Sequence, residues 1–327
     1  ADMVKSQRET GGLLQIGHQR HSNPRYLHLR DNVLPANLMG RITHAYGQWN
    51  RGVSASQPLG IPKGQEIAPD VLAKSGYDSM EEFRNWRWYS KYGGGPISDL
   101  GAHQIDLFNW FFKTKPVSVT AVGGVDYYDG TDGKAKFELP DNVLALYEYK
   151  LPTGIMRASY QVLTTTGSQG YYEKLLGVDG SVVISESPTS NQIYREPSAE
   201  DWGKHSTGDN PLVVRAPGSV KNKYWEQERT WEKPKPPSYA LGGLASAVAD
   251  VRESKALDPW ELPVVLKKYP HTPHLENFFE AARKRDQTIL NCPVLDAYHT
   301  CVTVLRCYDS IRSGSKYVFK PSDFDVA

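Results

Sequence analysis

The central part of the chain alternates hydrophobic and polar residues with a period of two. Five segments between residues 115 and 186 show this alternation, which is typical of strands with one buried face. They are VSVTAVGGVDY, NVLALYEYK, IMRASYQVLTT, YYEKLLGV and SVVISE. The sequence LPTG at 151–154 separates two of them and predicts a hairpin turn. Because no helical segment separates these strands, we expect a large, mostly antiparallel sheet.

The first fifty residues predict a helix followed by two strands. Residues 2–10 are typical of the end of a helix, which stops at the glycine pair at 11–12. The apolar run LLQIG at 13–17 predicts a short buried strand, and residues 41–49 predict another. A helix that ends at glycine and is followed by a buried strand is the order of elements in a parallel α/β unit. Because only one such unit is present, we expect residues 1–22 to be the end of a domain that begins earlier.

Two long loops and two helices complete the pattern. Residues 51–75 and 187–243 are rich in proline and glycine and predict loops. The second of these, which includes the sequence KPKPP, is expected to be a covering loop or a subunit arm. Thr272 and Pro273 predict a helix with an N-cap and a proline at its first position. A second helix from about 294 to 312 and a strand in YVFKPSDF close the chain.

The composition narrows the class of protein. With 327 residues, of which 39% are hydrophobic, the chain predicts one large or two ordinary domains. The formal net charge is +1 and no long basic run is present, which argues against nucleic acid as a partner. No apolar run approaches the ~20 residues of a membrane span. The three cysteines have no CxxC spacing and predict buried free thiols, which favours the cytoplasm but fits an exported protein as well.

One stretch carries candidate chemistry, GGGPISDLGAHQIDLFNW at 93–110. Asp99, His103 and Asp106 are spaced i, i+4 and i+7, so on one continuous helix they share a face. The hydrophobic residues spread over the other sides, which predicts a helix that is buried on most of its surface. Acid and imidazole groups on a buried helix need partners. The stripe therefore predicts either a satisfied structural network or a site.

As a site, His103 and Asp99 suit acid–base chemistry on an alcohol. A neutral imidazole can take a hydroxyl proton near neutral pH, and a carboxylate one turn away can orient the ring. The structural alternative is that Asp99 only caps the helix and His103 packs in the core. Asp and His at i and i+4 can also chelate a metal, but no third ligand is evident nearby, so we assign none.

A second polar cluster follows the expected strand at 13–17. The sequence HQRHSNP begins with His18, Gln19, Arg20 and His21, which together could bind hydroxyls or an anion, or could form a solvated loop. The segment NWRWYSKY, which contains Arg87, leads further aromatic and cationic side chains into the glycine run. The chain contains no G-x-G-x-x-G, P-loop, G-x-S-x-G or H-E-x-x-H motif.

Taken together, these stretches resemble the glucose–fructose oxidoreductase / inositol dehydrogenase / MocA (Gfo/Idh/MocA) family. The family's early segments are similar to LLQIGHQRHSNP and to the glycine-run motif. Its later strand–glycine–strand segment is similar to YYEKLLGVDGSVVISE, and its closing helices are similar to the stretch from HLENFFEAARK to YVFKPSDF. The resemblance covers nearly the whole chain. The motif positions that match are Gly95, Asp99, Gly101, His103, Ile105, Asp106 and Trp110.

The resemblance implies an α+β fold in which helices pack on one face of a large open sheet. It implies the end of a dinucleotide-binding Rossmann domain at 1–22 and a domain for substrate binding and oligomerisation at 23–327. It further implies His103 as acid/base and Asp99 beside it in catalysis. Gln19, Arg20, His21 and Arg87 would contact substrate, although an arginine is common in the family where His21 stands. His18 and Gln19 would contact NAD or NADP.

The implied activity is oxidation or reduction of a hydroxyl on a sugar, cyclitol or related polyol. The family's G-x-G-x-x-G loop and Glu-Lys-Pro motif have no counterpart in this chain. We therefore expect catalysis to need a Rossmann domain or partner chain that this sequence does not contain, and we expect a homo-oligomer formed through the sheet face. Two alternatives stay open: an NAD-dependent glycosidase that oxidises the sugar transiently, and a non-catalytic binding or assembly module.

Overall fold

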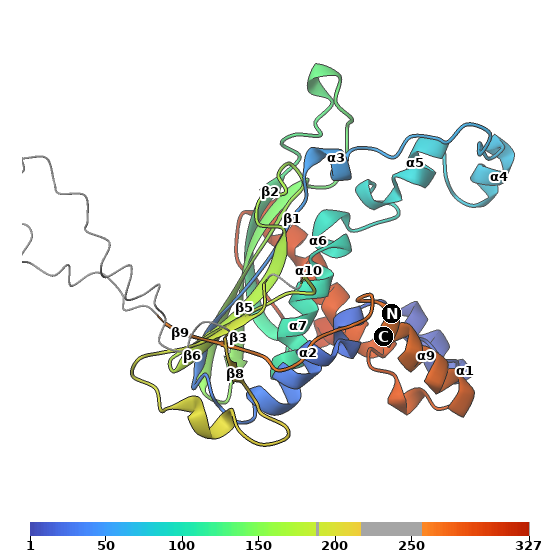
Figure 1. The fold of residues 1–327 in the computed structure, drawn as a ribbon. Helices are drawn as coiled ribbons and strands as arrows, with labels where there is room; N and C mark the ends of the chain where they lie inside the picture. Colours follow the sequence, from blue (N-terminus) through green and yellow to red (C-terminus); the bar gives the residue numbers. More distant parts are fainter. Residues whose placement is uncertain (188–189, 217–256, 327) are drawn as a thin grey trace, which may run out of the picture.

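A mixed sheet forms the centre of the computed structural model, which describes residues 1–187, 190–216 and 257–326. The ten strands of the described residues are ordered β10-β2-β3-β4-β1-β5-β6-β7-β9-β8 (Figure 1). Their bounds are β1 Ile42–Asn50, β2 Pro116–Gly124, β3 Asn142–Leu151, β4 Gly154–Leu163, β5 Tyr171–Gly177, β6 Gly180–Ile184, β7 Gln192–Arg195, β8 Val214–Arg215, β9 Asp258–Glu261 and β10 Tyr317–Val318.

The predictions of the five alternating strands and of the strand at 41–49 are confirmed. The five alternating segments form β2 to β6, and residues 41–49 form most of β1. LPTG makes the turn of the β3–β4 hairpin, where Gly154 has a φ of 121° that disfavours other residues. All neighbouring strands pair antiparallel except β1 and β4, which are parallel. This pairing places the end of β1 beside the end of β4, so the residues that follow these strands are neighbours.

The helices of the described residues lie mainly on one face of this sheet, as Figure 1 shows for α7 and α10. The inward residues of β3 and β4, such as Tyr147, Tyr149 and Tyr160, are almost fully buried there. The expected α+β architecture is therefore present. The helices are α1 Asp2–Thr10, α2 Pro24–His28, α3 Val53–Ser56, α4 Pro69–Lys74, α5 Met80–Arg84, α6 Gly95–Asp99, α7 Ala102–Phe112, α9 Thr272–Lys284 and α10 Val294–Ser313.

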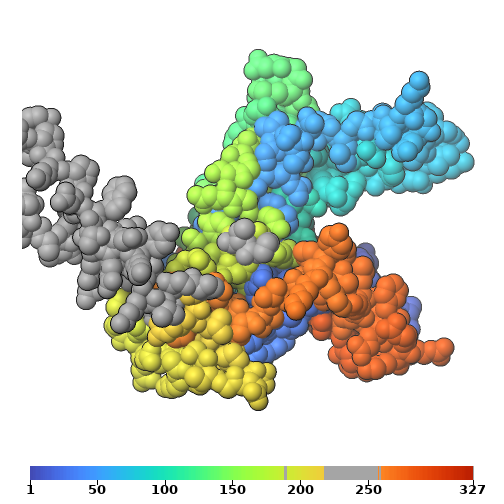
Figure 2. All heavy atoms as spheres, viewed as in Figure 1, coloured from blue at the N-terminus to red at the C-terminus, as the bar shows by residue number. Residues whose placement is uncertain are grey.

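The segment with α3, α4 and α5 leaves the sheet after β1. Figure 2 shows it projecting outward, apart from the body of the molecule that α9 helps to form. Its return path brings α5 and the turn Trp86–Trp88 back to α6. The expected loop at 51–75 therefore contains two short helices, and this segment covers one end of the sheet. The KPKPP sequence at 233–237 lies outside the described residues.

Three sequence expectations are wrong in detail. Residues 13–17 form no strand of the sheet, because only Gln15 makes an isolated bridge, to Pro293. The expected helix over 99–112 is two helices, α6 and α7, which are broken at Leu100 and Gly101. Cys301 is exposed, whereas the other two cysteines are buried. Helix α9 begins at the predicted Thr272, and α10 begins and ends close to its predicted bounds.

The first 22 residues pack against the C-terminal helices. Helix α1 contacts α10, and the turn Gln19–Ser22 contacts α9. Nothing in this packing separates residues 1–22 from the remainder, so the domain boundary at 22 stays a prediction. None of the described helices combines the length and the apolar character that crossing a membrane would require.

Candidate functional site

A cavity of about 360 Å³ lies at the end of the sheet that the α3–α5 segment covers. Its walls come from the end of β1, from α3, α5, α6 and α7, and from Thr164 just after β4. We call it the His103 cavity. Its polar and aromatic lining residues include Trp49, Arg51, Ser56, Arg84, Arg87, Asp99 and His103.

His103 faces this cavity from the first turn of α7. Its ring lies beside Trp49 and His18, with ring centroids 5.9 Å and 5.5 Å away. Burial, together with the positive charge of Arg20, lowers the pKa of His103 to about 3. The side chain is therefore neutral at physiological pH. Its Nδ1 atom is buried and has no hydrogen-bond partner, so it can serve a ligand.

Asp99 lines the same cavity, but it does not orient the His103 ring. Its carboxylate accepts a hydrogen bond from Nε of Arg87 at 3.0 Å. The prediction that Asp99 and His103 share one helix face is wrong, because the helix is interrupted between α6 and α7. Both residues nevertheless line one cavity, and Arg87 lines it as well, whereas its contact with substrate stays a prediction.

The third member of the predicted stripe, Asp106, is directed elsewhere. Its carboxylate lies 2.5 Å from Nε2 of His21 and 3.2 Å from Nδ1 of His18, and it accepts a 2.8 Å hydrogen bond from Thr300. Burial would raise the pKa of Asp106, but the two histidines outweigh burial and hold it well below its usual range. Burial would lower the pKa of His21, but Asp106 outweighs that effect and raises it. The acid is a charged centre of a buried network.

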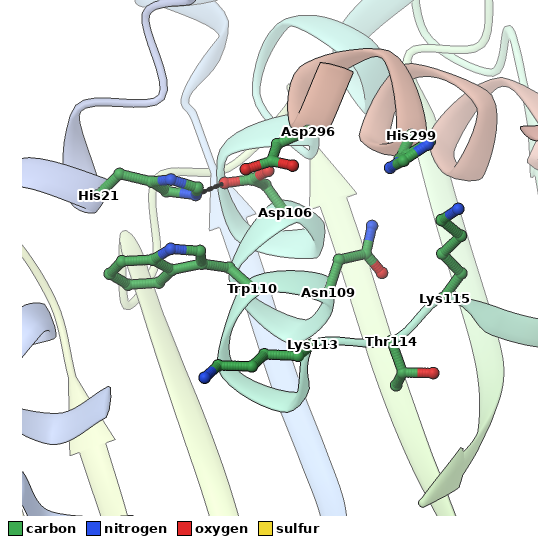
Figure 3. A pocket seen from close by; sticks show the side chains of 9 residues that line it. All are labelled: His21, Asp106, Asn109, Trp110, Lys113, Thr114, Lys115, Asp296 and His299. Carbon is green, nitrogen blue, oxygen red and sulfur yellow. Dashed lines mark hydrogen bonds and ion pairs between the residues drawn. The ribbon is translucent and has the colours of Figure 1, made fainter. Parts of the chain in front are cut away.

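This network borders a second cavity of about 290 Å³, which we call the His21 cavity. Figure 3 shows His21 and Asp106 at one end of it, with Asp296 and His299 from α10 and Lys115 further along. The structure therefore divides the polar stripe between two cavities. His21, predicted to contact substrate, does not line the His103 cavity.

Arg20 and Gln19 lie behind the His103 cavity rather than in its lining. Arg20 is fully buried, and its guanidinium forms ion pairs with Glu173 at 3.5 Å and Glu186 at 3.0 Å. These carboxylates hold the pKa of Arg20 above its ordinary value although burial opposes them. Gln19 donates a hydrogen bond to Glu186 at 3.0 Å. These ion pairs compensate the charge of Arg20, but its guanidinium nitrogens have no hydrogen-bond partner, and its contact with substrate stays a prediction.

Sequence reasoning missed several polar residues of the His103 cavity, among them Arg51, Ser56 and Arg84. Arg51 and Ser56 belong to the segment 51–75, which was expected to be a loop, whereas Arg84 ends α5, for which the sequence analysis made no prediction. Oγ of Ser56 and Nε of Arg84 are buried without a hydrogen-bond partner, as is Nδ1 of His103. Buried polar atoms are normally paired, so three such atoms around one cavity indicate a place for a polar ligand. The Trp49–Asn50–Arg51 sequence at a strand end was the one available signal.

Among the described residues, no group of three or more His, Cys, Asp and Glu side chains could hold a metal ion. His18 lies beside His103, and its contact with a dinucleotide stays a prediction. However, the chain has no glycine-rich loop to hold a pyrophosphate, and the Gln19 amide is engaged by Glu186. These residues alone do not make a dinucleotide site.

Comparisons with known proteins agree with this fold. Residues 70–181 match the family model described as the GFO/IDH/MocA C-terminal domain. That range includes both Asp99 and His103, the two predicted catalytic residues of the His103 cavity. No curated protein sequence matches the chain.

Three solved structures show the likeness in space. Aldose-aldose oxidoreductase from Caulobacter crescentus is 13% identical, with 97% of this chain and 67% of that chain covered and a TM-score of 0.58. An NAD-binding protein from Listeria innocua is 14% identical, with 97% and 70% covered and a TM-score of 0.56. Levoglucosan dehydrogenase in complex with NADH and levoglucosan is 13% identical, with 92% and 64% covered and a TM-score of 0.54. The chain thus spans about two thirds of the length of these proteins.

Proposed function

Because residues 70–181 match the GFO/IDH/MocA C-terminal domain, we propose that this chain forms the substrate side of an NAD(P)-dependent oxidoreductase. The substrate is a sugar, a cyclitol or a related polyol, and the reaction takes place at one of its hydroxyl groups. The solved structures that share the fold include a levoglucosan dehydrogenase with NADH and levoglucosan bound, which supports this class of substrate. A Rossmann domain outside this sequence would hold the dinucleotide, which supplies the hydride acceptor or donor.

The observation that carries the proposal is the set of unpartnered polar atoms in the His103 cavity. Ser56, Arg84 and His103 each have one such atom and line the same cavity, which also has Trp49 in its wall. A polyol presents several hydroxyls and an apolar ring face at once, so it can satisfy all three atoms and pack on the indole. The volume of about 360 Å³ lies in the range of small-molecule sites, which is ~300–1,000 Å³.

We assign His103 the proton transfer and Asp99 a positioning role. Because the His103 ring is neutral, its free nitrogen can accept the hydroxyl proton as hydride leaves the carbon. A pKa of about 3 makes the ring a weak base, so the substrate and the dinucleotide must supply much of the driving force. Asp99 is held by Arg87 at 3.0 Å, and in this position the pair can hydrogen-bond a second hydroxyl.

The decisive experiment assays the protein that contains this chain for NAD(P)-dependent oxidation of a panel of sugars and cyclitols. His103→Ala should lower kcat by ~10²–10⁴-fold, as for loss of a general base. The matched control is His271→Gln, which changes an exposed histidine before α9. Wild-type turnover by His103→Ala would remove the assignment. Sugar binding without turnover, with either dinucleotide present, would instead favour a binding module.

We also propose that the protein assembles through the outer face of the sheet, opposite α7 and α10. On this face Val122 of β2 lies beside Leu144 of β3, and Leu146 is the next outward residue of β3. Their exposed fractions are 63%, 46% and 44%. A contiguous apolar surface of this kind is typical of protein–protein contacts, and a second copy of the same sheet offers a complementary face.

A further inference from the structure

We propose that the substrate of the His103 cavity carries an anionic group, a carboxylate or a phosphate, which Arg51 and Arg84 bind. This inference rests on the proposed function and adds the charge of the substrate to it. Nothing in the family match or in the predicted site residues assigns a role to these two arginines.

The charges of the cavity lining do not balance. It contains Arg51, Arg84, Arg87 and a single carboxylate, that of Asp99. Asp99 is paired with Arg87 at 3.0 Å, and His103 is neutral. Among the residues that the structure describes, no carboxylate lies within ion-pair distance of Arg51 or Arg84. The cavity therefore has two positive charges that the protein itself does not compensate.

The chain compensates a neighbouring arginine where no ligand is expected. Arg20 lies behind the same cavity wall and stacks over Trp49, 5.5 Å from the ring centroid. Unlike the two cavity arginines, it has the carboxylates of Glu173 and Glu186 within 3.5 Å. Arg51 and Arg84 are half-buried and line an open cavity, so a ligand bound there can supply the counter-charge that the protein does not.

The backbone is fixed at both arginines before any ligand binds. Arg51 donates its backbone N–H to Leu163 at 2.8 Å, and its guanidinium lies 5.7 Å from the Trp49 ring centroid. Arg84 is the last residue of α5, and its Nε atom is buried. The side chain of the next residue, Asn85, ties this turn to the covering segment.

The side-chain amide of Asn85 forms hydrogen bonds with both backbone groups of Leu59. It accepts a 2.7 Å hydrogen bond from the backbone N–H of Leu59 and donates a 3.2 Å hydrogen bond to the Leu59 carbonyl. Asn85 is only 4% exposed. The wall that carries Arg84 is therefore fixed relative to the wall that carries Ser56, whose buried hydroxyl can donate to an anion. Preorganised guanidinium groups bind carboxylate and phosphate oxygens with paired N–H donors.

The test measures binding by titration calorimetry with the whole chain at low ionic strength. The probes are glucose, glucuronate and glucose 6-phosphate, the corresponding three galactose compounds, and inorganic phosphate alone. The variants are Arg51→Gln, Arg84→Gln and the double variant, with Arg283→Gln on the exposed side of α9 as control. Circular dichroism and thermal melting establish that each variant is folded. We expect one charged sugar to bind at least ~10-fold more tightly than its neutral parent, since hydrogen bonds to charged groups are strong.

The same experiment separates the outcomes. Loss of the charge preference in Arg51→Gln and Arg84→Gln, but not in Arg283→Gln, supports the inference, and the preferred probe tells carboxylate from phosphate. Equal binding of neutral and charged sugars overturns it while the proposed function stands. Binding of phosphate alone, abolished in the double variant, keeps the anion site and removes the sugar function. No binding of any probe overturns both.

Discussion

Nε2 of His21 lies 2.5 Å from the Asp106 carboxylate, and both side chains are almost fully buried. The ring of His21 also stacks on Trp110, with centroids 4.2 Å apart. The same carboxylate contacts His18, whose ring lies beside His103. Asp106 is therefore a positioning residue that links the wall behind His103 to the packing of α7, and it can act on the site without touching a ligand.

Asp106→Asn should destabilise the protein strongly. The substitution removes the counter-charge of His21 and His18 and leaves buried imidazoles with a weaker partner. Breaking a buried pair from one side typically costs about 3–5 kcal/mol in the free energy of unfolding, measured by urea titration. Asp309→Asn is the matched control, because Asp309 forms its ion pairs near the surface of α10 and should cost no more than about 1 kcal/mol. Equal losses in the two variants would show that the buried network does not stabilise the fold.

The His21–Asp106 pair should make stability depend on pH in a defined direction. Asp106 raises the pKa of His21 above 6.5, so this contribution is complete below about pH 6.5 and is lost as the pH rises through the folded value. The pKa of Asp106 is depressed, so its contribution is complete above about pH 4 and is lost in more acidic solution. Asp296 also faces His21 and adds to its raised pKa.

The measurement is the free energy of unfolding of wild type and His21→Gln from pH 5 to pH 9. The difference between the two proteins should be largest near pH 5–6 and should shrink toward pH 9. A difference that is constant with pH would mean that His21 contributes only packing, for example its stacking on Trp110.

The sheet could be predicted from the sequence because period-two alternation is a local signal. Leu144 and Leu146 alternate with Val143, Ala145 and Tyr147, and the structure places the first pair outside and the others in the core. The bounds of α10 could also be predicted from local signals, because Pro293 precedes its first residue and Gly314 follows its last. The prediction of a strand at 13–17 was wrong because an apolar run of five residues does not reveal whether a neighbouring strand exists.

The site could be predicted only in part. The spacing of Asp99 and His103 predicted that the two residues lie near each other, and both line one cavity. The assumption of a continuous helix was wrong, so the two residues do not share one helix face. Arg84 and Ser56 had no local signal, because they reach the cavity only after the α3–α5 segment folds back. That return depends on Asn85 and Leu59, 26 residues apart, and no periodicity reports such a contact.

Gly101 should be intolerant of a side chain. A Cβ atom there would lie 2.4 Å from the carbonyl oxygen of Ile97 and 2.9 Å from the Tyr160 ring, although the backbone conformation itself suits any residue. Gly101→Ala should therefore cost about 1–3 kcal/mol by overpacking, measured by urea unfolding. Gly60→Ala is the control, because nothing lies within 4 Å of its Cβ position, and it should change stability by no more than about 0.5 kcal/mol. An unchanged free energy of unfolding in Gly101→Ala would contradict the close packing around Gly101 between α6 and α7.

The proposed assembly predicts that a charge on the outer sheet face lowers the oligomeric state. Leu144 and Leu146 lie on β3, the third strand from the β10 edge, so an Asp at either position would stand in the middle of a sheet-to-sheet contact. Burying an unpaired carboxylate there is unfavourable, so Leu146→Asp should shift the protein toward the monomer in light scattering after size exclusion. Val265→Asp is the control, because Val265 is 67% exposed in a loop outside the sheet. If wild type is monomeric at working concentrations, or Leu146→Asp keeps the wild-type mass, the outer face is not the subunit interface.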